Sequence, residues 1–269
     1  MNTAFDKILL AYDNSDAAKA ALQSAYGVAK NFNSHITALV VSGKDTDMES
    51  SKNALNAFMS ENQVDMEIIE RNGEVYDEVI KLEKERDYGL ILLGSHGSSG
   101  WRKLWMGSNA FKVISSSTCP VISVTEKASS PELKHILLPL ADSRNTRQKV
   151  PYCIEIAKAF DATVHIIGVS KSSSTETQKH VNSYVHQTEN YLTERGVKCT
   201  SKTEFGVSVA ETCITYAEEV NAGLMLIMTE TESAGLFMDS YSQQLVNHSS
   251  VPVMSIHSRD TRLTGAAGY

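Results

Sequence analysis

The chain has 269 residues, of which 42% are hydrophobic and 21% are charged, and its formal net charge is −7. This composition is typical of a soluble globular protein with one or two domains. The negative charge argues against a general nucleic-acid binder or a protein of anionic membrane surfaces. The apolar runs are too short to cross a bilayer, and the start MNTAFDKILLAYD lacks the features of a signal peptide. We therefore expect a cytoplasmic protein.

In the first half, short apolar runs alternate with segments of helical periodicity. The expected strands are 6–12, 35–42, 65–70, 88–94 and 120–124, and the expected helices are 15–32, 48–62, 74–86 and 107–117. Ser15 and Asp16 can cap the first helix, and Ser108 can cap the last one. An alternation of this kind predicts a parallel sheet with helices on both faces.

The second half repeats the first. KILL at 7–10 returns as HILL at 135–138, AKNFNSHITALVV at 29–41 as AKAFDATVHIIGV at 157–169, and STCPVISV at 117–124 as SSVPVMSI at 249–256. The order is kept while the offset drifts slightly, which indicates a duplicated unit. The strands expected in this half are 135–140, 163–169, 198–204, 223–228 and 251–256. The expected organisation is an N-terminal domain at 1–125, a linker at 126–134, a C-terminal domain at 135–257 and a flexible tail at 258–269.

The positions of the cysteines and histidines indicate whether disulfides or a metal site are expected. The four cysteines, at 119, 153, 199 and 213, lie far apart without a CxxC pair, which favours reduced and mostly buried thiols. His180 and His186 lie six residues apart and would face different sides of an expected helix. We expect no metal site built from these side chains.

Two strand ends of the first half carry residues suited to a ligand. The first strand ends in LLAYDNSD, with Ala11 and Asp13, and the fourth leads from Gly94 into the loop GSHGSSGWRKLWMGS at 94–108. In open parallel sheets, ligands bind at the carboxyl ends of the strands where the strand order reverses. This loop ends at the start of a helix, and a helix N-terminus suits phosphate. We infer a nucleotide site here, with plain turn formation as the alternative role of the glycines.

The loop resembles the nucleotide signature of the universal stress protein family, G-x2-G-x9-G-S/T, with Gly94, Gly97, Gly107 and Ser108 at the fixed positions. KILLAYDNSD resembles the first strand of the family and STCPVISV its last strand. The resemblance covers the chain twice, so the chain is similar to a tandem universal stress protein. It implies an α/β fold of two doubly wound, Rossmann-like domains of the adenine nucleotide alpha hydrolase-like type. Each would have a five-stranded parallel sheet in the order 3-2-1-4-5.

The resemblance also implies a ligand, which is ATP with a divalent ion such as Mg²⁺. Transferred position by position, the adenosine part is held by Ala11, Asp13, Val40 and Val41. The phosphates are held by Gly94, Gly97, Gly107, Ser108 and Asn109. Many members have proline where Ala11 stands. Members commonly pair through their last strands, which implies pairing of the two domains within this chain and makes a homodimer a candidate assembly. The sequence does not identify a protein partner.

The second half lacks most of the signature. Its corresponding stretch is LMLIMTETESAGLFMDSYS at 224–242, where Met228, Thr231 and Asp239 stand at the three glycine positions. An ungapped match puts Ala141 where Asp13 stands in the first half. The acidic residues of this loop would repel phosphates. We therefore expect ATP binding in the first half alone.

Three functions are compatible with these patterns. The first is a nucleotide-binding regulator, at most a slow ATPase, because no general base stands beside the loop. The second is a hydrolase, since HGSSG at 96–100 and GVSVA at 206–210 superficially match hydrolase motifs, but the repeat makes Ser208 a simple helix-start residue. The third is an interaction module that binds no nucleotide, which the second half favours.

Overall fold

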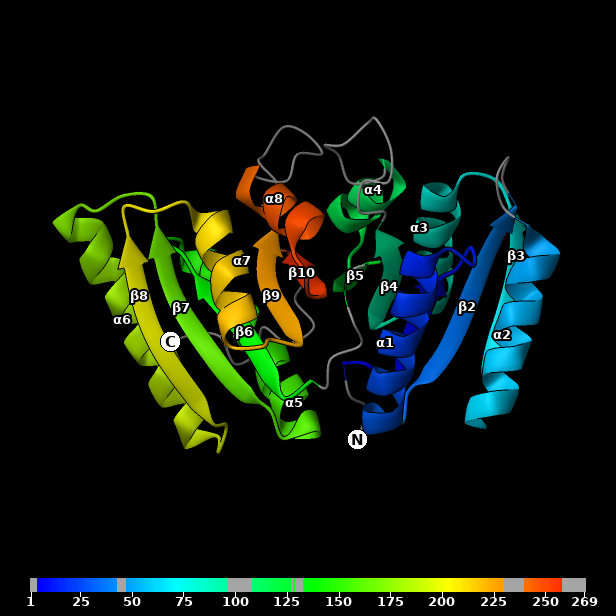
Figure 1. Cartoon of the computed structure of the whole chain (residues 1–269), viewed down its shortest axis with the longest axis horizontal. Coiled ribbons are helices and arrows are strands. Elements are labelled where there is room, and N and C mark those ends of the chain that lie inside the picture. The colour runs from blue at the N-terminus through cyan, green and yellow to red at the C-terminus, as the bar shows by residue number, and fades with distance from the viewer. Residues whose placement is uncertain are drawn as a thin grey trace. The chain divides into compact units, whose positions relative to one another are not determined.

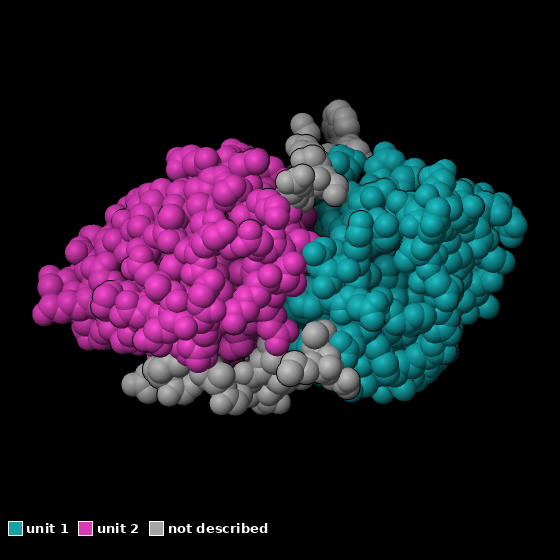
Figure 2. All heavy atoms as spheres, turned by 90° about the horizontal axis from the view of Figure 1, so that it is seen from below, with its two compact units in different colours: residues 1–130 teal, residues 131–269 magenta. Residues whose placement is uncertain are grey.

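The structure is a computed structural model and describes residues 4–42, 47–95, 108–126, 128, 133–229 and 240–257. The chain divides into two compact units, residues 1–130 and 131–269, which Figure 2 distinguishes by colour. The boundaries of the predicted domains and linker stay predictions. The predicted tail, 258–269, lies outside the described residues.

Unit 1 alternates strands and helices along the chain (Figure 1). Its elements are β1 (Lys7–Ala11), α1 (Asp16–Phe32), β2 (His35–Ser42), α2 (Met48–Asn62), β3 (Met66–Asn72), α3 (Val75–Arg86), β4 (Leu90–Ser95), α4 (Ser108–Ser116) and β5 (Val121–Thr125). The strands pair in parallel in the order β3-β2-β1-β4-β5. The predicted order 3-2-1-4-5 is therefore confirmed, with β1 between β2 and β4.

Unit 2 repeats this plan. Its elements are β6 (His135–Leu140), a 3₁₀ turn η1 (Arg144–Arg147), α5 (Val150–Phe160), β7 (Thr163–Ser170), α6 (Thr175–Glu194), β8 (Cys199–Phe205), α7 (Val209–Glu219), β9 (Leu224–Thr229), α8 (Ser240–His248) and β10 (Val253–His257). The order is β8-β7-β6-β9-β10, again all parallel. Because crossovers between parallel strands are right-handed, the first two helices of each unit lie on one face of its sheet and the last two lie on the other face.

The cores follow from the sequence pattern. The inner strands β1, β4 and β9 are mainly runs of apolar residues that are buried, as the sheet interior of an α/β protein requires. Helix α1 buries a face made mostly of alanine, with Ala17, Ala18, Ala21 and Ala25 all nearly inaccessible to solvent. Because alanine is short, this helix approaches the sheet closely. Among the described residues, no helix is long and apolar enough to cross a membrane.

The cysteine prediction is confirmed in its main point. All four cysteines are free thiols, and Cys119, Cys153 and Cys213 are buried while Cys199 is half-buried. Burial raises the pKa of Cys153 and of Cys213 to about 12. Both therefore remain protonated at neutral pH and are poor nucleophiles.

A buried carboxylate fastens α3 to the turn before β5. Glu83 is 3% exposed, and its Oε1 accepts hydrogen bonds from the N–H groups of Thr118 and Cys119, at 2.8 and 3.0 Å. The Thr118 hydroxyl donates to the same oxygen at 2.8 Å. These bonds satisfy backbone donors of a connection that lies inside the protein.

We expect Glu83→Ala to lower the free energy of unfolding by about 3 kcal/mol, because it leaves buried N–H donors without an acceptor. Glu85→Ala, on the same helix, is the control: it removes an exposed ion pair with Arg71 and should cost less than about 1 kcal/mol. Urea unfolding followed by circular dichroism measures both. Equal losses for the two variants would contradict the structural role of Glu83.

Two histidines share a hydrogen bond on the sheet of unit 2. The Nδ1 of His135 and the Nε2 of His165 lie 3.0 Å apart, and the Nδ1 of His165 lies 2.9 Å from the Thr200 hydroxyl. The ring of Tyr216 on α7 packs edge-on against His165, and Lys202 of β8 lies over that tyrosine ring. Burial, and then the neighbouring His135, lower the pKa of His165.

This histidine pair should make unit 2 less stable in acid. The unfolded chain binds a proton near the ordinary histidine pKa of about 6.5, whereas the folded chain binds it at lower pH. Stability is therefore full above about pH 6.5 and falls as the pH is lowered, by at most about 1.4 kcal/mol per pH unit from this group. Urea unfolding of wild type and His165→Gln at pH 7.5 and 5.5 measures the difference. An unchanged pH dependence in the variant would refute the assignment.

Candidate functional site

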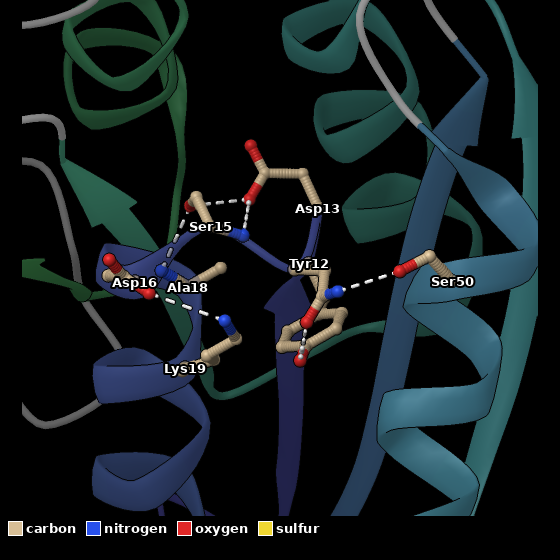
Figure 3. A network of polar contacts seen from close by, with 8 residues as sticks. Tyr12, Asp13, Ser15, Asp16, Ala18, Lys19 and Ser50 are labelled. Atoms are coloured by element: carbon tan, nitrogen blue, oxygen red, sulfur yellow. Dashed lines mark hydrogen bonds and ion pairs between the residues drawn. The ribbon is translucent and has the colours of Figure 1, made fainter.

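The turn between β1 and α1 holds Asp13 in a fixed orientation (Figure 3). Its Oδ1 accepts hydrogen bonds from the N–H and the hydroxyl of Ser15, at 3.1 and 2.6 Å. The Ser15 hydroxyl in turn accepts from the N–H of Ala18 and caps α1, as predicted. The second oxygen of Asp13, Oδ2, points away from the turn. The carboxylate is thus exposed and already oriented for a hydrogen-bond donor.

Asn14 anchors the same turn to its surroundings. It has a left-handed backbone with φ of 63°, a conformation that asparagine tolerates better than most residues. Its Oδ1 accepts from the Tyr12 hydroxyl at 3.2 Å, and its Nδ2 donates to the Ser50 hydroxyl on α2 at 2.9 Å. Burial, and then the charge of Asp13, raise the pKa of Tyr12, so its hydroxyl stays protonated as a donor. The sequence analysis did not identify this network, although the dipeptide Asn-Ser is a turn signal.

The end of β1 brings Ala11, Asp13 and Gly94 to one edge of the sheet. Ala11 pairs with Leu39 on one side and Leu93 on the other, so Asp13 follows β1 at the edge where β4 also ends. This is the switch point of the strand order, as predicted. Ala11 itself is half-buried.

The two valines of β2 differ in what they can offer. The last bond from β1 to β2 runs from the Tyr12 N–H to the Leu39 carbonyl at 2.9 Å. Because backbone groups alternate sides along a strand, those of Val41 face the β1 side beyond this bond, whereas those of Val40 face β3. Both side chains are buried. The structure therefore favours Val41 over Val40 for backbone contact with a ligand.

Gly94 has a packing role that the sequence analysis did not foresee. A Cβ at this position would lie 2.6 Å from the carbonyl carbon of Ala17 and from the amide nitrogen of Ala18, both in the first turn of α1. Glycine is required here because the helix backbone passes directly over β4. Gly94 therefore does not by itself argue for phosphate, because close packing against α1 is enough to require glycine here.

The remaining signature residues are only partly visible. Gly97 and Gly107 lie outside the described residues. Ser108 is the first residue of α4, and Asn109 follows it, which confirms that a helix starts where the loop ends. The side chains of Ser108 and Asn109 lie outside the description, as does the predicted cap.

Unit 2 builds the corresponding edge differently. Ala141 stands in the place of Asp13, and its N–H donates to the Thr146 hydroxyl at 3.0 Å. The neighbouring Asp142 lies 3.3 Å from His180 of α6, so that acid has a partner within the unit. Lys149 is 2% exposed and donates to the Thr146 carbonyl at 2.6 Å. The loop at 230–239 lies outside the described residues, and among the described ones no group of three acidic, histidine or cysteine residues could hold a metal.

Comparison with a family model identifies the family of this chain. The model of the universal stress protein family matches residues 4–125 and again 132–257. The chain belongs to the universal stress protein family. The match occurs twice, which confirms the prediction of a tandem member.

Known universal stress proteins extend this finding. The protein YxiE of Bacillus subtilis (strain 168) is 29% identical over 147 residues, a match that covers 45% of this chain and 99% of that protein. The crystal structure of a universal stress protein from Archaeoglobus fulgidus DSM 4304 covers 94% of this chain and 98% of its own, with a TM-score of 0.74 and 19% identity. This similarity shows that nearly the whole chain has the same fold as that protein. A shorter universal stress protein, solved in complex with cAMP, matches 47% of this chain at 14% identity and a TM-score of 0.39.

The packing role of Gly94 can be tested with a matched pair of glycines. We expect Gly94→Ala to lower the free energy of unfolding by about 2 kcal/mol or more, because the new methyl group overlaps the backbone of α1. Gly27→Ala is the control, since a Cβ there meets no atom within 4 Å and alanine favours the helix by about 0.5–1 kcal/mol. Thermal unfolding of both variants should show opposite shifts in Tm. A neutral Gly94→Ala would contradict the close packing.

Proposed function

We propose that this universal stress protein is an ATP-binding regulator of a stress response that holds one ATP, with Mg²⁺, in unit 1. The observation that carries the proposal is the complete signature from Gly94 to Ser108, which starts at the sheet edge where the Asp13 turn is already oriented. A ligand at the strand ends is the general rule for open parallel sheets.

The adenosine part would use the two strand ends beside β1. The outward oxygen of Asp13 can accept hydrogen bonds from ribose hydroxyls, because its other oxygen is already bound to Ser15. The backbone N–H and C=O of Val41 can pair with the ring nitrogen and the amino group of adenine. Ala11 is small, and it would allow the base to approach the end of β1. Val40 would contribute packing rather than a hydrogen bond.

The phosphates would lie on the loop that leads to α4. Gly97 and Gly107 would let the backbone approach the phosphate oxygens, and the N-terminus of α4, with Ser108 and Asn109, would add N–H donors and a favourable dipole. Mg²⁺ would be held largely by the phosphate oxygens and water, the ligands that it prefers in nucleotide sites. When bound, the ion neutralises phosphate charge.

Unit 2 would act as a scaffold without ATP. It lacks an acid at the position of Asp13, and the nearby Asp142 is paired with His180. It also lacks the glycines of the signature. Ser208, the residue on which a hydrolase interpretation would depend, lies at the N-cap of α7, where the repeat predicts a helix start. A binding role, with ATP hydrolysis at most slow, fits this chain best.

Isothermal titration calorimetry of the full chain with ATP and Mg²⁺ tests the proposal. We expect one site per chain. Asp13→Ala should weaken binding by about tenfold or more, because a charge-assisted hydrogen bond is lost. Gly107→Asp, which copies Asp239 of unit 2, should abolish binding through repulsion of the phosphates.

Asp142→Ala is the matched control, since it removes the nearest acid of the corresponding turn in unit 2. It should leave ATP affinity unchanged. Circular dichroism should show that all variants remain folded. Two sites per chain, or full affinity in Gly107→Asp, would overturn the proposal, and mass spectrometry of the denatured purified protein would show whether a nucleotide co-purifies.

A further inference from the structure

Unit 1 contains a pocket of about 370 Å³ that is lined by residues of α1 and α2 and by Tyr12. Its floor is formed by the buried side chains of Tyr12, Leu22 and Phe58. Three alanines also line it, and the exposed side chains of Lys19, Gln23 and Glu61 mark its open side, which we call the mouth. The lining residues are Tyr12, Lys19, Ala20, Leu22, Gln23, Ala54, Ala57, Phe58 and Glu61.

The duplication allows the lining of this pocket to be compared with the corresponding residues of unit 2. The offset of 128 residues, constant from β1 through α1 to β2, makes Arg147 of unit 2 the equivalent of Lys19. Near the end of α2 the offset is 133, because the bond from Val64 N–H to the Met59 carbonyl corresponds to the bond from Val197 N–H to the Leu192 carbonyl. Ala54 therefore corresponds to Gln187.

In unit 2 the equivalent residues are longer and contact each other. Arg147 donates a hydrogen bond to the Oε1 of Gln187 at 2.6 Å, across the gap from η1 to α6. Its guanidinium also lies 4.7 Å from the ring centre of Tyr184, the equivalent of Ser51. In unit 1 the shorter Ala54 lines the pocket, and Lys19 pairs instead with Asp16 of its own helix at 3.3 Å (Figure 3).

The lining defines the chemistry of an occupant. The volume lies within the range of small-molecule sites, about 300–1,000 Å³, and such sites are mainly apolar with few polar groups. The inner surface is aromatic and aliphatic. At the mouth, one cation and one anion, Lys19 and Glu61, stand on the two helices, so their charges nearly cancel and favour no charged ligand.

We propose that this pocket of unit 1 binds a small uncharged molecule with an aromatic ring or a short aliphatic body. The apolar part lies against Tyr12, Leu22 and Phe58, and any polar group lies at the mouth. The site is separate from the proposed nucleotide site, although Tyr12 belongs to the network that holds the turn of Asp13.

The test uses indole as the probe on the full, isotopically labelled chain without nucleotide. Backbone amide shifts of Ala20, Ala54 and Ala57 should change and saturate with a dissociation constant of about 1 mM or tighter. The double change Lys19→Arg with Ala54→Gln copies the Arg147–Gln187 pair of unit 2. Because the longer side chains would occupy the pocket, the change should weaken binding by at least tenfold. Asn56→Gln, at an exposed position of α2 outside the lining, is the control and should bind indole like wild type.

The single change Ala54→Gln repeats the test with one substitution. It therefore gives a result even if the double variant is less stable than wild type. The proposal is overturned if indole fails to shift these amides in a saturable way, or if the filled variants bind it as tightly as wild type. No ATP is present, so the outcome is independent of the nucleotide site.

Discussion

The central position of β1 determines where everything else in unit 1 can lie. This strand pairs with β2 on one side and β4 on the other, and all strands are parallel. Every strand therefore ends at the same edge, and the chain must leave that edge in opposite directions from β1 and β4. The Asp13 turn and Gly94, the first glycine of the signature, lie at the same edge for this reason.

The close approach of α1 to the sheet is the second consequence of this arrangement. The alanine face of α1 and the absent side chain of Gly94 are two halves of one contact. In unit 2 the chain continues from β6 through a 3₁₀ turn before α5 begins, and Met228 occupies the position of Gly94. In unit 2, therefore, the glycine is absent and the helix after the first strand begins later in the chain than α1 does in unit 1. The same duplication shows a second such change, where Arg147 and Gln187 are joined by a hydrogen bond while the equivalent Lys19 and Ala54 line a pocket.

The sequence predicted the strands, their order and the family, because those features depend on local periodicity and on a motif with fixed spacing. Unit 2 follows the same periodicity, and its repeat of the first half is visible without any structure. The sequence also predicted the helix cap at Ser15 and the edge at which Asp13 lies.

The remaining features depend on contacts between segments distant in the sequence. The need for glycine at position 94 arises from the backbone of α1, more than 70 residues away in the chain. The backbone groups of Val41 face the β1 side and those of Val40 do not, because the last hydrogen bond from β1 goes to the Leu39 carbonyl. The sequence does not show which carbonyl accepts this bond. The histidine pair of unit 2 joins strands whose register the sequence alone does not give.

The hydrogen bond from Tyr12 to Asn14 links the pocket between α1 and α2 to the turn that carries Asp13. Tyr12 forms the floor of the space between α1 and α2, and it also steadies the turn that carries Asp13. If a molecule against Tyr12 changes the affinity for ATP by some factor, thermodynamic reciprocity requires ATP to change the affinity for that molecule by the same factor. Unit 1 would then respond to two chemical signals together, with a coupling free energy given by the affinity for ATP measured with and without the second molecule.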